Sequence, residues 1–219
     1  MSARTEILAR VAKALDAVPS HIATEFEGEA PRAYRRSTEV APGSPEAIEI
    51  LVDRLVDYRA VVHTAENLAE LPLVIAEVLA GSATLVHPDG LDPQWLGDLP
   101  AALAVHEDSL ANPIATLDLD RIEAVLTACR VAVADTGTII LDGEADQGRR
   151  AITLVPDTHV CVVLAAQVVH ILPEAVDILA EHPVRAQTWI SGPSATSDIE
   201  LNRVEGVHGP RNLHVIIVG

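Results

Sequence analysis

The stretch WISGPSATSDIELNRVEGVHGPRNLHVIIVG, residues 189–219, sets the architecture that the sequence predicts. One apolar run ends at Trp189 and Ile190, a second fills residues 213–218, and a polar segment rich in glycine and proline separates them. Glycine lets the backbone come close to a ligand, and proline fixes the turn beside it. Two strands joined by such a loop are how α/β proteins build a site at the edge of a sheet. The sequence therefore predicts that this C-terminal loop carries the site.

Upstream of this stretch, helical patterns alternate with apolar runs. Ser44, Pro45 and Glu46 form a typical helix start, with an N-cap, a proline at the first helical position and an acidic first turn. This start predicts a helix over residues 44–58. The other expected helices cover residues 4–17, 66–79, 93–96, 119–128 and 173–180. The expected strands cover residues 60–63, 83–86, 102–105, 131–134, 138–141, 151–154 and 159–164, besides the two C-terminal runs.

The spacing of these elements indicates the fold class. Strands that alternate with helices imply parallel crossovers and a layered α/β domain. Between residues 138 and 164 the strand-like runs follow one another closely, which suits antiparallel pairing. We therefore expect a three-layer, Rossmann-like α/β domain with a mixed, mostly parallel sheet over residues 44–219. Residues 1–43 are expected to form an N-terminal helix and an irregular arm.

Composition and charge exclude several classes of function. The formal net charge of −17 argues against a nucleic-acid partner or an anionic membrane surface, because their phosphates need Lys and Arg. No apolar run reaches transmembrane length and no signal-peptide block is visible, so we expect a cytoplasmic protein without a membrane span. Cys129 and Cys161 lie far apart in apolar runs and no CxxC occurs, so we expect no metal and no resident cofactor.

A basic cluster, Arg32, Tyr34, Arg35 and Arg36, stands out in the otherwise acidic chain. It suits docking on an acidic surface of another subunit, which leaves a homo-oligomer open, or binding of an anion. A solvated arm explains the same residues.

Two polar loops hold the candidate site residues. Asp135, Thr136, Gly137 and Thr138 follow a strand, where hydroxyls and free N–H groups beside glycine can cradle an anion. A tight turn between two strands explains the same residues. In the C-terminal loop, residues 191–194 form a potential anion-binding nest. Ser197 and Glu200 fit a capping box, which is a structural alternative for them.

The Gly-Val-His-Gly-Pro-Arg run at residues 206–211 is the second half of the C-terminal loop. His208 lies in a turn beside glycine, where it suits acid–base work or carboxylate binding, although a hydrogen-bonded structural role is open as well. Arg211 can bind a carboxylate or phosphate with two hydrogen bonds, or be a surface cation.

Four segments carry a resemblance to a known family. In these segments the chain resembles the LUD-domain family, and in particular its lactate-utilisation members. The segments are VADTGTIIL (133–141), TLVPDTHVCVV (153–163), and GPSATSDIE (192–200) followed by GVHGPRNLHVII (206–217). The resemblance implies a fold similar to the sugar-isomerase and CoA-transferase superfamily. It makes His208, Glu200 and Asp135 the catalytic candidates. It implies ligand-binding residues at Thr136, Gly137, Thr138, His159, Ser191, Gly192, Ser194, Asp198, Gly206, Gly209 and Arg211.

The resemblance also implies a function. Lactate-utilisation members work with two iron–sulfur proteins that oxidise L-lactate to pyruvate. Because this chain has no motif for a cluster or a flavin, we expect an accessory or substrate-handling subunit that binds a small anionic metabolite at its C-terminal loops. The alternatives are a stand-alone isomerase or CoA-transferase type of enzyme acting on a phosphorylated or CoA-linked molecule, and a pure assembly protein.

Overall fold

A computed structural model describes residues 3–16, 33–196, 204–205 and 208–219. The chain divides into two units, Met1–Arg35 and Arg36–Gly219. The described part of the first unit contains helix α1, Ala3–Asp16. Its apolar side chains Ile7, Leu8 and Val11 are exposed. No helix among the described residues is long and apolar enough to cross a membrane.

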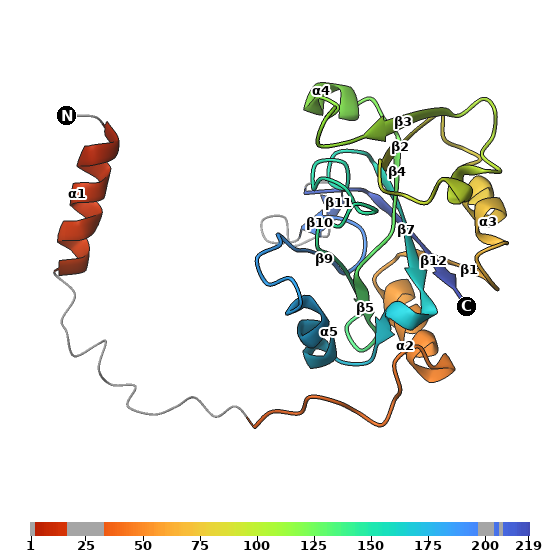
Figure 1. Ribbon diagram of the computed structural model, residues 1–219, viewed down its shortest axis with the longest axis horizontal. Helices are drawn as coiled ribbons and strands as arrows, with labels where there is room; N and C mark the ends of the chain where they lie inside the picture. The colour runs from red at the N-terminus through yellow and green to blue at the C-terminus, as the bar shows by residue number, and fades with distance from the viewer. Residues whose placement is uncertain (1–2, 17–32, 197–203, 206–207) are drawn as a thin grey trace. The chain divides into compact units, whose positions relative to one another are not determined.

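A six-stranded parallel sheet is the centre of the second unit, and Figure 1 shows its strands. Its order is β1 (Val61–Ala65), β12 (Asn212–Val218), β7 (Thr158–Leu164), β4 (Ala124–Thr127), β2 (Thr84–Pro88) and β3 (Ala104–Asp108). All five pairings are parallel. The C-terminal strand predicted at residues 213–218 is therefore next to the centre of the sheet, between β1 and β7.

A second, four-stranded sheet has the order β8 (Val168–Val169), β5 (Val131–Val133), β6 (Thr138–Leu141) and β9 (Thr188–Ile190). The β5–β6 and β6–β9 pairings are antiparallel, and β5 pairs with β8 in parallel. A short antiparallel pair joins β10 (Ala195–Thr196) to β11 (Val204–Glu205). The mixed pairing that the sequence predicts is thus divided between two main sheets.

Apolar layers cover both faces of the parallel sheet. Helix α2 (Pro45–Asp57) and the second sheet pack on one face, where Leu51 and Leu55 join Cys161 in one buried cluster. Helix α3 (Leu71–Val78) packs on the other face, where Ile75 joins Val162. In Figure 1, β5 and β9 lie on the opposite side of the sheet from α3. Strands buried on both faces carry continuous apolar runs, and the three-layer α/β prediction is confirmed.

The remaining helices are short: η2 (Pro93–Leu96), α4 (Thr116–Leu119), η3 (Ala165–Gln167) and α5 (Leu172–Leu179). Helix α2 begins as predicted, since the Ser44 hydroxyl accepts a hydrogen bond from the Ala47 N–H at 3.2 Å and Pro45 is the first helical residue.

Three sequence predictions for residues 119–164 are wrong. A helix was expected at residues 119–128, but α4 already ends at Leu119 and residues 124–127 form the buried strand β4. The reason is that the periodicity of a short apolar run does not distinguish a buried strand from a buried helix. Residues 151–154 form turns instead of a strand, and Ile152 packs in a buried cluster. β7 is parallel to both of its neighbours, β12 and β4, and residues 128–157 between β4 and β7 are long enough for the crossover that a parallel pair needs.

Candidate functional site

Two adjoining cavities lie along the face of the parallel sheet that the second sheet covers in part. The large cavity has a volume of about 700 Å³ and the small cavity about 310 Å³. The large cavity is lined by Asp89, which directly follows β2, and by Asp108, the last residue of β3. Residues of β9 and the starts of β7 and β12 line the small cavity. Arg150, Thr153 and Thr188 belong to the walls of both cavities, so the two volumes meet at these three residues.

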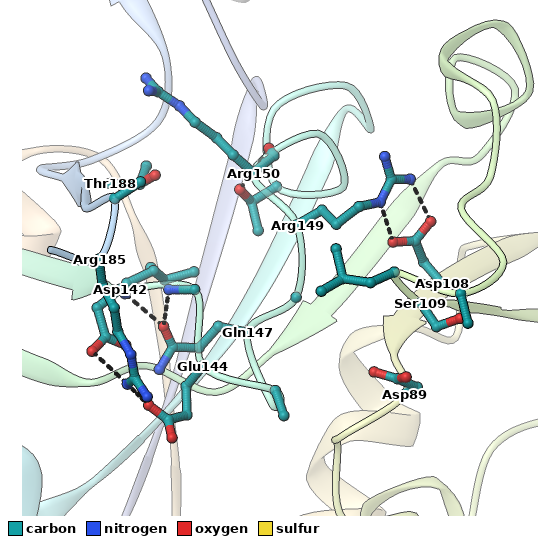
Figure 2. Close-up of a pocket in the computed structure, with 18 residues that line it drawn as sticks. Asp89, Asp108, Ser109, Asp142, Glu144, Gln147, Arg149, Arg150, Arg185 and Thr188 are labelled. Carbon is teal, nitrogen blue, oxygen red and sulfur yellow. Dashed lines mark hydrogen bonds and ion pairs between the residues drawn. The ribbon is translucent and has the colours of Figure 1, made fainter. Parts of the chain in front are cut away.

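An ion pair holds one wall of the large cavity in place. The Arg149 guanidinium donates to the buried Asp108 carboxylate from Nε at 2.8 Å and from Nη2 at 2.5 Å (Figure 2). The Ile114 N–H donates to the same carboxylate at 2.9 Å. Burial by itself would raise the pKa of Asp108, but the hydrogen bonds from Arg149 and Ile114 outweigh it and lower that pKa. The charges of Arg149 and Asp108 therefore each have a partner within the protein.

A second group of charges closes the opposite wall. Arg185 pairs with the buried Asp142 at 3.2 Å and also with Glu144. The Gln147 side-chain oxygen accepts from the backbone N–H of Asp142 at 2.7 Å. Burial raises the pKa of the neighbouring Asp146 carboxyl. These contacts fix the loop that follows β6, and Figure 2 shows them grouped away from the Asp108 pair.

Arg150 differs from its neighbour Arg149. Its guanidinium makes no hydrogen bond or ion pair with any residue that the structure describes, although it lines both cavities. In Figure 2 its side chain extends away from the Asp108–Arg149 pair. A guanidinium offers planar, forked donors that match a carboxylate or a phosphate. Arg150 is thus a cation available to an anionic ligand where the cavities meet.

The small cavity gathers several residues that the sequence singles out. Its walls include the predicted residues His159, Ser191, Gly192, Ser194, His208 and Gly209. The Ser194 hydroxyl accepts from the His208 N–H at 3.0 Å, and the Ser194 N–H donates to the Pro210 carbonyl at 2.8 Å. These two bonds join the halves of the C-terminal loop. The roles predicted for these residues remain predictions.

His159 forms part of the floor of the small cavity. Its side chain is buried, and its Nε2 lies 2.8 Å from the Thr127 hydroxyl on the neighbouring strand β4. Burial lowers the pKa of His159 to about 4. The imidazole is therefore neutral at neutral pH.

The loop at residues 135–138 lies elsewhere. It is the turn of the β5–β6 hairpin, and none of its four residues lines either cavity. The Asp135 carbonyl accepts from Arg54 of helix α2 at 3.4 Å. The Thr138 hydroxyl lies 2.8 Å from the Ser191 hydroxyl, which is the link between this turn and the C-terminal loop. The structure supports the tight-turn interpretation, and the catalytic role of Asp135 stays a prediction.

The other predicted residues divide into two groups. Arg211 pairs with Asp157 at 2.6 Å at an exposed position and lines neither cavity. Glu200, Asp198 and Gly206, together with the capping box that begins at Ser197, lie outside the described residues.

Comparison with known proteins places the chain in a family. The family model described as LUD domain matches residues 48–218, which is most of the chain. This protein belongs to the LUD domain family. A protein of Deinococcus radiodurans named lactate utilization protein C is 48% identical over 178 residues, which cover 80% of each chain. Another of the same name from Anoxybacillus flavithermus is 35% identical over 111 residues, 48% of this chain and 50% of the relative.

A solved structure is similar to this chain in sequence and in fold. The crystal structure of a DUF162 family protein from Deinococcus radiodurans is 42% identical, with a TM-score of 0.67. The match covers 80% of this chain and 97% of that one. The family suggested by the sequence motifs is therefore confirmed.

Some residues of the small cavity lie outside the motifs that carry the family resemblance. Arg150 and Trp189 line the cavity and Thr127 supports it, and no local pattern marks these three as site residues. Arg149 and Arg150 are adjacent cations in an acidic chain, which is a detectable pattern. Which of the two has no partner depends on Asp108, which is far away in the sequence.

Proposed function

We propose that this chain is a substrate-handling subunit of an L-lactate utilisation system and that it binds a small carboxylate in the small cavity. The observation that carries the proposal is Arg150, a cation at the junction of the cavities with no partner among the described residues. The relatives named lactate utilization protein C support the choice of pathway. In this proposal the carboxylate of lactate or pyruvate pairs with Arg150.

The surroundings of Arg150 suit a small polar acid. Thr153 and Thr188 supply hydroxyl groups beside it, and Ser191 and His208 lie along the same cavity. Trp189 adds an apolar wall. A charged pair in a partly enclosed site is stronger than in water, because the local dielectric constant is lower. The ligand is therefore oriented by its carboxylate, while its other end faces the hydroxyl and imidazole groups.

Oxidation of lactate to pyruvate releases two electrons. We propose that iron–sulfur partner proteins accept them, since the chain contains two cysteines, both buried, and a cluster takes four ligands. The role of this subunit is then to bind and present the acid. We propose that the subunit works in the cytoplasm.

Growth on L-lactate as the sole carbon source tests this proposal. A host that lacks the gene receives the wild-type gene, Arg150→Gln or the control Arg121→Gln. Arg121 is an exposed arginine paired with Asp118 outside both cavities. The wild type and Arg121→Gln should restore growth, and Arg150→Gln should not, although immunoblots show equal amounts of protein. Full growth with Arg150→Gln would contradict the proposed site, and normal growth of the deletion strain would contradict the pathway.

A further inference from the structure

Two histidines on neighbouring strands face each other at a place that neither cavity includes. His63 Nε2 on β1 lies 3.0 Å from His214 Nδ1 on β12, and both side chains are partly buried. The two rings are inclined by 15°, and their centroids are 5.3 Å apart. A contact of this length between ring nitrogens is a hydrogen bond, so one of the two atoms carries the hydrogen and the other accepts it.

This histidine pair can take up one proton without losing its hydrogen bond, but not two. A neutral imidazole has one N–H group and one lone pair, whereas an imidazolium has two N–H groups and no lone pair. When one ring is protonated, its N–H group still donates to the lone pair of the other ring. When both rings are protonated, two N–H groups and two positive charges face each other, and the bond is lost. The count is the same whichever ring donates in the neutral pair.

The surroundings of the pair oppose the doubly charged form. Burial lowers the pKa of His63, an effect that Glu77 of helix α3 partly offsets. Burial and the neighbouring His63 both lower the pKa of His214. On the other side of β12, strand β7 places the apolar Val160 beside His214. Among the described residues, Glu77 is thus the one acidic group whose charge acts on the pair, and it can balance one added proton but not two.

The pair lies directly behind the small cavity. Successive residues of a strand point to opposite faces of the sheet, so Leu213 lines the small cavity while His214 points to the face that α3 covers. β12 begins directly after the C-terminal loop, whose two halves are joined by the hydrogen bond from Ser194 to Pro210. His63 therefore fixes the first residues of β12, and with them one wall of the small cavity, to the edge strand β1.

We propose that the His63–His214 pair is a pH-sensitive clamp that holds the start of β12, and so one wall of the small cavity, in place at neutral pH and releases it in acidic solution. The first added proton leaves the clamp closed, and the second opens it by charge repulsion. Because β1 lies at the edge of the sheet, opening the clamp loosens this edge and leaves the central strand pairings intact. The clamp acts on the cavity wall whatever ligand the cavity binds.

Nitrogen-15 NMR of histidine-labelled protein tests the proton count. In the wild type the pair should titrate in two separate steps, the second at a lower pH than the first. A glutamine amide can donate or accept a hydrogen bond, so His63→Gln keeps a partner for His214 and removes the second charge. In this variant His214 should titrate at a higher pH than the second step of the wild type. A single step at one pH for both wild-type histidines would overturn the proposal.

Hydrogen exchange measured by mass spectrometry tests the opening itself. Protection factors, which correct for the intrinsic pH dependence of exchange, are compared at pH 7.5 and pH 4.5. The control is His106→Gln, which changes an exposed histidine on the opposite edge strand β3. On acidification, the wild type and this control should lose about tenfold more protection in β1 and the start of β12 than in the central strand β4.

The two clamp variants should behave differently from the wild type. In His63→Gln and in His214→Gln the additional loss of protection at β1 and the start of β12 should be less than about threefold, because the pair can no longer hold two charges. The second variant keeps the test decisive if the first does not fold. Equal additional losses in all four proteins, or none in the wild type, would overturn the proposal.

Discussion

Arg54 and Gly137 meet where the end of helix α2 packs on the β5–β6 turn. A Cβ atom placed on Gly137 would lie 2.8 Å from the Cβ of Arg54 and 3.1 Å from its carbonyl carbon. Gly137 also has a φ of +57°, which disfavours a side chain. Packing and backbone conformation thus require a glycine at position 137, whether or not the Asp-Thr-Gly-Thr motif binds a ligand.

Substitution of this glycine should destabilise the fold. Gly137→Ala should lower the free energy of unfolding by about 3 kcal/mol, because strain at positive φ adds to a clash with helix α2. The matched control is Gly143→Ala, which has a φ of +74° but no atom within 4 Å of the added Cβ. The control should lose about 1 kcal/mol. Urea denaturation at pH 7 measures both, and equal losses would contradict the packing argument.

The Asp108–Arg149 pair should contribute to stability as well as to the shape of the large cavity. Asp108→Asn should lower the free energy of unfolding by about 3 kcal/mol, since it leaves Arg149 without its buried charged partner. The control Asp118→Asn breaks an exposed pair and should cost less than about 0.5 kcal/mol. Because the folded pKa of Asp108 is lowered, its contribution is present above the unfolded pKa and is lost as the pH falls through the folded pKa. Denaturation of the variants at pH 7 checks the two losses, and a stable Asp108→Asn protein would contradict this role.

His159 should make the fold sensitive to mild acid. Its pKa is about 4 in the folded state and about 6.5 in the unfolded state. Below pH 6.5 the unfolded chain binds a proton that the folded chain does not bind until about pH 4, so falling pH favours unfolding. The full effect is on the order of 3 kcal/mol. His159→Gln should therefore lose less stability than the wild type between pH 7 and pH 4.5, and parallel pH profiles would contradict the prediction.

Asp135 should be dispensable for lactate growth. Its loop lines neither cavity, so Asp135→Asn should restore growth of the deletion strain as well as the wild type does. If the chain were a CoA-transferase type of enzyme with Asp135 as the nucleophile, mass spectrometry would detect a covalent adduct after incubation with acyl-CoA. An adduct on Asp135, together with loss of growth, would replace the substrate-handling proposal.

The sequence predicted the fold class because its apolar runs and helix starts are local signals. The start of α2 at Ser44 and Pro45 needs no tertiary information. β4 was mistaken for a helix, since residues 124–127 are all buried and a continuous apolar run has no period that separates a strand from a helix. The separation of two sheets depends on long-range pairing, such as β6 with β9, which no local pattern contains.

The site was predictable in part for the same reason. Glycine, serine and histidine between two strands marked the C-terminal loop, and the structure brings Ser194, His208 and Gly209 to one cavity. Arg150 was missed because its importance lies in the absence of a partner within the described residues. Only the fold distinguishes the two adjacent arginines, because Asp108 at the end of β3 pairs with Arg149.

The most direct measurement is a calorimetric titration of L-lactate into the purified wild-type protein, Arg150→Gln and Arg121→Gln. We predict that the wild type and Arg121→Gln bind with equal affinity. Arg150→Gln should bind at least about tenfold more weakly, because it loses a charge-assisted pair with the carboxylate. Unchanged affinity in Arg150→Gln would contradict the central claim that Arg150 binds the acid.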